Sequence, residues 1–220
     1  MGPEVGAQYS PLVMGIARAI ARVWLPLAYW YRAEGVSHVP DAGPVILAPN
    51  HTSFLDPILI TYPLTKRRLY YLAWHRLFGN PVFARLIRAL GAISLDTDRK
   101  ADRAAFEAAL ALLKHGEAIC LFPEGIRGWD GRLYPLQPGV ARLALATGAP
   151  IVPVVVEGAL EAWPRWRLLP GAFTPIRVTF LPAIRPRECR SATERRAESD
   201  RLLAELQTAL RSRLESRARP

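Results

Sequence analysis

The chain has 220 residues, half of them hydrophobic and 22% charged, and carries a formal net charge of +10 at pH 7. This length fits one domain with short appendages, and the apolar content is enough for a sizeable core, which argues against global disorder. Two cysteines, Cys120 and Cys189, are too few for a secreted disulfide scaffold and indicate reduced thiols in a cytoplasmic protein. The positive charge favours anionic partners: nucleic acid, an acidic membrane surface or phosphorylated substrates.

The first predicted element is an apolar helix from Leu12 to Tyr31, interrupted by Arg18 and Arg22. The two arginines share one helical face, and apolar residues cover the others. An arginine at the centre of a membrane-spanning helix costs about 2.5–3.5 kcal/mol, so a helix lying in the membrane interface is favoured over a spanning one. An amphipathic helix that docks on its own domain is the alternative.

Strand and helix signals alternate along the rest of the chain. Short apolar runs predict strands at residues 44–48, 69–74, 92–95, 118–122, 151–156 and 176–181. Helices are predicted at residues 54–62, 81–90, 99–114, 140–147 and 193–217. Continuous apolar strands between helices are typical of an α/β fold with a mostly parallel central sheet covered by helices. We expect an N-terminal interfacial helical segment, an α/β domain and a charged C-terminal helix, at residues 1–33, 34–190 and 191–220 respectively.

A polar cluster, Asn50–Pro57 (NHTSFLDP), follows the first predicted strand. Open α/β sheets bind ligands at the carboxyl ends of their strands. If His51 lies in the loop and Asp56 in the first helical turn, Asp56 can accept a hydrogen bond from one imidazole nitrogen and fix the tautomer. The other nitrogen is then free to take a proton from a substrate hydroxyl. Alternatively, Asp56 is only the capping-box partner of Ser53, and His51 is an ordinary loop histidine.

A second cluster, Phe122–Arg127 (FPEGIR), lies just beyond another predicted strand. Gly125 permits a close backbone approach or a positive φ, and Arg127 suits a phosphate group. An ordinary strand-to-helix turn with a surface ion pair is the alternative. Pro153, in the strand that follows, is more typical of an edge strand or a bulge than of a functional site.

The blocks NHTSFLDP, FPEGIR and IVPVVVEG, in this order and spacing, resemble the glycerolipid acyltransferases related to 1-acylglycerol-3-phosphate acyltransferase. The resemblance covers residues 35–181. It implies that His51 is the general base and that Asp56 orients it. It also implies that Glu124, Gly125 and Arg127 bind the acceptor phosphate.

Two positions depart from the family pattern. Ile126 stands where the family usually has threonine. Thr97 stands where an arginine is expected, and Arg99 comes two residues later. Either Arg99 reaches back to the acceptor, which makes it a further candidate for substrate binding, or Arg127 works without it.

The resemblance implies direct acyl transfer in phospholipid biosynthesis, from an acyl-CoA or an acyl carrier protein to the free hydroxyl of lysophosphatidic acid, giving phosphatidic acid. No cofactor, metal or acyl-enzyme is implied, and His38, His75 and His115 show no metal-ligand spacing with either cysteine. Backbone N–H groups near His51 are expected to stabilise the oxyanion. With the apolar N-terminal helix and the positive charge, the implied enzyme is peripheral or monotopic, on the cytoplasmic face of an anionic membrane.

Other functions stay open at this point. The acceptor could instead be another lysolipid or glycerol 3-phosphate. The protein could also be a hydrolase, in which water attacks the thioester. A catalytically inactive, basic lipid-binding protein on the same fold is a further alternative. Nucleic-acid binding is disfavoured, because the sequence shows neither aromatic residues interleaved with Lys and Arg on a strand nor a recognisable docking helix.

Overall fold

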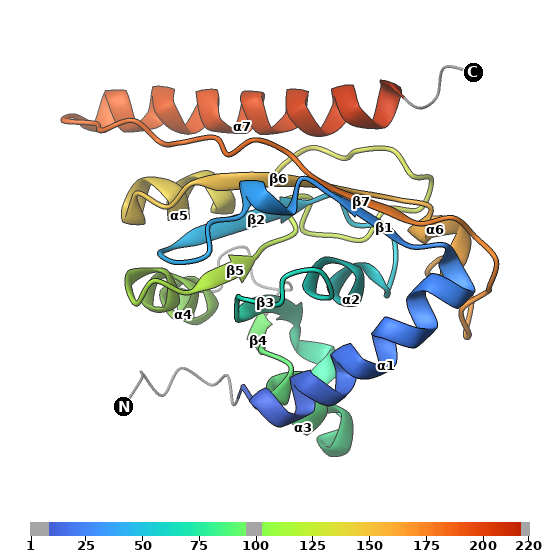
Figure 1. Cartoon of the computed structure of the whole chain (residues 1–220). Helices are drawn as coiled ribbons and strands as arrows, with labels where there is room; N and C mark the ends of the chain where they lie inside the picture. Colours follow the sequence, from blue (N-terminus) through green and yellow to red (C-terminus); the bar gives the residue numbers. More distant parts are fainter. Residues whose placement is uncertain (1–8, 96–102, 217–220) are drawn as a thin grey trace.

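A seven-stranded sheet in the order β1-β7-β6-β2-β5-β3-β4 forms the centre of the computed structural model, which describes residues 9–95 and 103–216 (Figure 1). All neighbouring strands are parallel except β6 and β7, so the predicted mostly parallel sheet is confirmed. The strands are β1 (Arg32–Glu34), β2 (Val45–Pro49), β3 (Leu69–Trp74), β4 (Ala92–Leu95), β5 (Ala118–Cys120), β6 (Ile151–Glu157) and β7 (Arg177–Phe180).

Helices cover both faces of the sheet, which explains why its strands are apolar on both sides. In β2, Val45 and Leu47 enter the core shared with α1, α2 and α6, whereas Ile46 and Ala48 enter the core shared with α4, α5 and α7. The helices are α1 (Pro11–Tyr29), α2 (Asp56–Thr61), α3 (Pro81–Ala89), α4 (Arg103–Lys114), α5 (Gly139–Thr147), α6 (Ala159–Ala162) and α7 (Ala192–Ser216). Short 3₁₀ turns lie at Val36–His38 and His75–Phe78.

The predicted C-terminal helix is α7, which runs across one side of the sheet (Figure 1). Leucines of its predicted apolar seam, Leu202, Leu206 and Leu210, are fully buried against α5 and the sheet. The helix therefore covers a sheet face of the domain. Of the predicted helix 99–114, residues 99–102 lie outside the described residues.

One edge of the sheet differs from a simple parallel arrangement. Strand β7 pairs antiparallel with β6, and the three-residue β1 pairs parallel with β7. Strand β1 is polar and too short for an apolar run, so no periodicity predicts it. Pro153 lies in β6 inside the sheet, between the ladder that ends at Phe180 and an isolated bridge from Ile151 to Ile184. Its missing N–H is tolerated at this interruption of the pairing, not at a sheet edge.

Helix α1 docks on the domain by one face and leaves an apolar stripe outside. Met14, Ala21, Leu25 and Tyr29 are buried. Arg18, predicted to share a polar face with Arg22, instead turns inward, and its Nη2 donates to the carbonyl of Leu64 at 2.6 Å. The outer apolar stripe is exposed and consists of Leu12, Ile16, Ile20, Val23 and Leu27. Among the described helices, α1 is long enough and apolar enough to cross a membrane, judged by length and composition alone.

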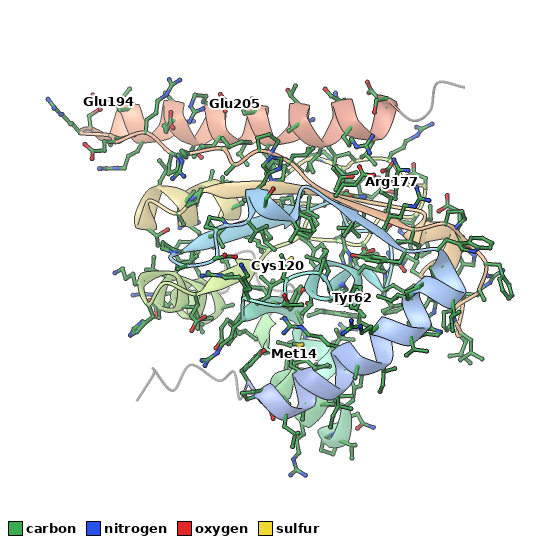
Figure 2. All side chains as sticks on the ribbon, in the orientation of Figure 1. Met14, Tyr62, Cys120, Arg177, Glu194 and Glu205 are labelled. Atoms are coloured by element: carbon green, nitrogen blue, oxygen red, sulfur yellow. The ribbon has the colours of Figure 1, made fainter. Side chains whose placement is uncertain are left out.

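The two cysteines are free thiols in separate parts of the structure. Cys120 lies on β5 in the middle of the molecule (Figure 2) and is fully buried, which raises the pKa of its thiol well above the ordinary value. Cys189 is partly exposed, in the segment before α7. The pairing of these cysteines with each other is therefore absent, and the reducing compartment stays a prediction.

Candidate active site

The three motifs meet because they follow three neighbouring strands. Strands β6, β2 and β5 are adjacent and parallel, so their carboxyl ends lie at the same edge of the sheet. The His51 loop follows β2, and the FPEGIR loop follows β5. A backbone hydrogen bond joins these two loops directly: the N–H of Gly128 donates to the carbonyl of His51 at 2.8 Å.

His51 and Asp56 form the predicted pair. His51 Nδ1 lies 2.8 Å from Asp56 Oδ2, and the same oxygen accepts from the backbone N–H groups of Thr52 and Ser53 at 2.8 and 2.9 Å. Asp56 is fully buried, whereas the His51 side chain is 21% exposed. Since the oxygen acts as acceptor, Nδ1 carries the hydrogen, and Nε2 keeps the lone pair that a general base requires.

The capping and orienting roles of Asp56 are compatible. Asp56 is the first residue of α2, and its carboxylate accepts from two backbone donors that precede the helix. One oxygen therefore both closes the helix N-terminus and orients the imidazole. The predicted capping box is half present, because Asp56 accepts from the N–H of Ser53. The hydroxyl of Ser53 accepts from the N–H of Leu55 instead of that of Asp56, and it donates to the carbonyl of Trp163 at 2.8 Å.

Two further residues hold the imidazole in place. The ring of Phe122 stacks on that of His51, with centroids 3.9 Å apart and planes tilted by 24°. Asn50 exchanges two hydrogen bonds with the backbone of Val156, at 2.8 and 3.0 Å, and so extends the pairing of β2 with β6 up to the residue before His51. Both residues lie in the sequence motifs, Asn50 in NHTSFLDP and Phe122 in FPEGIR, but their residue types alone predict no role for either.

Glu124 contacts the protein backbone, which differs from the predicted contact with the acceptor phosphate. Its Oε1 accepts from the N–H of His51 and its Oε2 from the N–H of Tyr134, both at 2.8 Å. The side chain is buried, and burial raises the pKa of the carboxyl, opposed by these two hydrogen bonds. Both oxygens of this buried carboxylate are engaged, and Glu124 therefore positions the His51 loop. Direct binding of the acceptor phosphate by Glu124 is disfavoured, because the two negative charges repel each other.

Replacing Glu124 by alanine is expected to lower the free energy of unfolding by about 2–4 kcal/mol, because two partly buried N–H donors lose their acceptors. Chemical denaturation of wild type and variant measures this loss. Glu161→Ala is the matched control, since that carboxylate is exposed on α6. An equal stability for Glu124→Ala and Glu161→Ala would contradict the positioning role.

Arg127 lies beside the pair on the FPEGIR loop. Its guanidinium carbon sits 3.5 Å from the centroid of the Phe54 ring, and Nε is buried without a hydrogen-bond partner among the described residues. Burial and the nearby charge of Arg165 both lower the pKa of Arg127, whereas Asp56 raises it. The arrangement leaves a cation next to His51 with no carboxylate paired to it in the described structure.

Two glycines of the motifs have clear backbone reasons. Gly125 has φ +71°, which favours glycine, and its amide closes a turn onto the carbonyl of Phe122. Gly158, which ends the IVPVVVEG block, has φ +81°, and a Cβ there would lie 2.0 Å from the carbonyl oxygen of Pro175. Gly158 is therefore required by packing rather than by chemistry.

The expected oxyanion donors near His51 are already used. The N–H groups of His51, Thr52 and Ser53 donate to the carboxylates of Glu124 and Asp56. The expectation is wrong for these three amides, because two buried carboxylates already accept their hydrogen bonds. Any stabilisation of a tetrahedral oxyanion must come from other donors.

Comparison with known proteins identifies the family. A family model described as Acyltransferase matches residues 31–157. The chain belongs to this acyltransferase family. The matched region contains His51, Asp56 and the FPEGIR loop, so the assembled site lies inside the acyltransferase domain.

Relatives and a solved structure agree with this assignment. The chain is 28% identical over 151 residues to the chloroplastic 1-acyl-sn-glycerol-3-phosphate acyltransferase BAT2 of Brassica napus, covering 66% of this chain and 43% of that protein. It is 30% identical over 140 residues to the human 1-acyl-sn-glycerol-3-phosphate acyltransferase alpha, covering 59% and 47%. The chain spans less than half the length of each of these relatives.

The crystal structure of the 1-acyl-sn-glycerophosphate (LPA) acyltransferase PlsC from Thermotoga maritima shares the fold. The TM-score is 0.73 at 24% sequence identity, over 95% of this chain and 80% of that one. The acyltransferase fold therefore extends over nearly the whole chain, α1 and α7 included. Of the predicted site residues, Arg99 lies outside the described residues, and its role stays a prediction.

Proposed function

We propose that this protein transfers a fatty acyl group from a thioester donor to the free hydroxyl of lysophosphatidic acid, giving phosphatidic acid. The observation that carries the proposal is the His51–Asp56 pair, 2.8 Å apart, beside the guanidinium of Arg127, whose Nε has no hydrogen-bond partner among the described residues. The pair supplies a general base, and the guanidinium supplies a partner for the phosphate of the acceptor. The names of the relatives support the same reaction.

The proposed chemistry is a single displacement. His51 Nε2 takes the proton from the acceptor hydroxyl while the oxygen attacks the thioester carbonyl. The resulting tetrahedral intermediate collapses by breaking the C–S bond, and the proton on His51 passes to the leaving thiolate. The imidazolium that forms in between is stabilised by the buried Asp56 carboxylate. No protein nucleophile takes part, so no acyl-enzyme is expected.

The two proposed substrates are an acceptor with a phosphate group and a thioester donor. The phosphate of lysophosphatidic acid would bind the guanidinium of Arg127, on the loop whose turn Gly125 forms, and the donor is an acyl-CoA or an acyl carrier protein. The assembled pair favours an enzyme over an inactive lipid-binding protein, because a binding protein has no use for a buried carboxylate that fixes a histidine tautomer. A hydrolase would release thiol without acceptor.

The experiment that tests this proposal is product analysis by mass spectrometry. Purified protein is given palmitoyl-CoA, or palmitoyl-acyl carrier protein, with lysophosphatidic acid, glycerol 3-phosphate or lysophosphatidylcholine. We expect phosphatidic acid from the first acceptor and little product from the others. Free palmitate as the main product would instead identify a hydrolase, and no product with any pair would favour the inactive lipid-binding protein.

We also propose that the protein acts as a peripheral or monotopic enzyme on the cytoplasmic face of an anionic membrane. The outer apolar stripe of α1 is exposed, with Leu12 at 73% and Leu27 at 70%. Helix α3, which packs beside α1, exposes further apolar side chains, and the ring of Trp30 contacts that of Phe173 in the loop before β7. Apolar side chains on neighbouring elements suit an interfacial position, and the net positive charge suits anionic lipids.

Serine replacements at Leu12, Ile16, Ile20 and Leu27 are expected to weaken sedimentation with anionic liposomes at least about tenfold, because each side chain loses its apolar burial in the lipid. Substitution is preferable to deletion of α1, since Leu25 and Tyr29 belong to the core and residues 32–34 form β1. Unchanged thermal unfolding controls for folding. Undiminished sedimentation of the folded variant would contradict the membrane role of this stripe.

A further inference from the structure

The irregular segment between α6 and β7, residues 163–175, lies against the candidate site. Ser53 donates to the carbonyl of Trp163, and the ring of Trp163 contacts Phe54 with centroids 5.3 Å apart. Arg165, two residues on, places Nη1 3.3 Å from the carbonyl of Arg127. The segment thus brings a second arginine to the FPEGIR loop from a distant part of the chain.

The guanidinium of Arg165 lies against the backbone of Arg127, and the described residues supply no acid that neutralises either arginine. Both side chains are half-buried, and neither forms an ion pair with a carboxylate among the described residues. Their mutual repulsion contributes to lowering the pKa of Arg127, and Nε of Arg127 has no partner in the described structure. Two like charges on neighbouring loops are unfavourable alone, and a bound anion that contacts both arginines reduces their repulsion.

An aromatic ring lies against each guanidinium. The guanidinium carbon of Arg165 lies 3.6 Å from the centroid of Trp129, and that of Arg127 lies 3.5 Å from the centroid of Phe54. Trp129 itself is stacked parallel to Trp166, with planes 1° apart. A guanidinium stacked on a ring points its N–H groups outward in its own plane, which is the geometry for a planar, bidentate contact with phosphate oxygens.

We propose that Arg165 is a second phosphate ligand, and that Arg127 and Arg165 together bind the phosphate monoester of the acceptor. The inference rests on the proposed function for the identity of the acceptor, but the anion site itself follows from the two arginines. Arg165 lies outside the FPEGIR block and in a stretch without periodicity, so no sequence pattern indicates it. Its role would make the enzyme selective for acceptors with a terminal phosphate over neutral ones.

The test measures binding and catalysis separately. Glycerol 3-phosphate is the soluble probe, titrated by ³¹P NMR against wild type, Arg165→Gln, Arg165→Lys and Arg167→Gln. Arg167 is the matched control, because it lies on the same segment, is exposed and carries the same charge. Acceptor-dependent thiol release then gives the KM for lysophosphatidic acid and for palmitoyl-CoA with each protein.

We expect Arg165→Gln to weaken binding of glycerol 3-phosphate, and to raise the KM for lysophosphatidic acid, by about tenfold or more, since a charge-assisted hydrogen bond is lost. The KM for palmitoyl-CoA should stay unchanged, Arg165→Lys should be intermediate, and Arg167→Gln should behave as wild type. Glycerol 3-phosphate binding by a folded Arg165→Gln protein within twofold of wild type would overturn the inference. A wild type that binds the probe through Arg165 but transfers no acyl group would contradict the proposed function and leave the anion site standing.

Discussion

Replacement of His51 by alanine is expected to reduce acceptor-dependent acyl transfer by about 10²–10⁴-fold, the range that a positioned general base contributes. The loss should appear in kcat, because His51 acts on the proton of the hydroxyl during attack and does not hold the acceptor in the ground state. The backbone contacts of His51, with Glu124 and Gly128, do not depend on the imidazole, so the loop should keep its position.

The control for this substitution is His115→Ala. His115 is exposed at the end of α4, and its ring bonds the local carbonyl of Ala111, so its loss should leave the rate unchanged. Comparison of kcat for wild type and both variants, with thermal unfolding measured on each, completes the test. A folded His51→Ala protein with wild-type kcat would show that another group takes the proton.

Replacement of Asp56 by asparagine should have the second-largest effect, also within about 10²–10⁴-fold on kcat. Asparagine keeps an oxygen that can accept from Thr52 and Ser53, but it removes the charge that stabilises the imidazolium. Its amide can also present a donor to Nδ1, which would favour the wrong tautomer of His51. The choice of asparagine over alanine matters, because alanine would leave buried N–H donors unsatisfied and unfold part of the site.

Asp41→Asn is the matched control for Asp56, since Asp41 is exposed and paired with Lys66 on the surface. Its kcat should equal that of wild type. Denaturation curves recorded in parallel with kcat separate a loss of His51 orientation from a loss of folding. Asp56→Asn should remain folded, with a moderately lower free energy of unfolding. Full activity in the folded Asp56→Asn protein would mean that Asp56 only caps α2.

Much of the fold follows from apolar runs in the sequence. The predicted strands 69–74 and 92–95 coincide with β3 and with the edge strand β4, because each is a short, mostly apolar run whose first residues are buried. The antiparallel pairing of β7 and the short polar β1 could not be predicted in this way. Their pairing depends on contacts between distant segments, which leave no local periodicity.

In the site, too, local sequence predicts some features and contacts between distant segments decide the others. Sequence order placed His51 and Asp56 at a strand end, where adjacency of β2 and β5 makes the two motifs meet. The contact of Glu124 with two backbone amides could not be predicted, because those donors come from residues before and after it in the chain. Arg165 approaches through a loop without regular structure, so only the folded chain reveals it.

Acceptor-dependent acyl transfer with His51 as general base is decided by thiol release from palmitoyl-CoA, measured with and without lysophosphatidic acid on wild type and His51→Ala. We expect wild type to release thiol only when the acceptor is present, and the variant to lose this release. Equal release by wild type with and without acceptor would contradict acyl transfer, and acceptor-dependent release that survives in His51→Ala would contradict the role of His51 as general base.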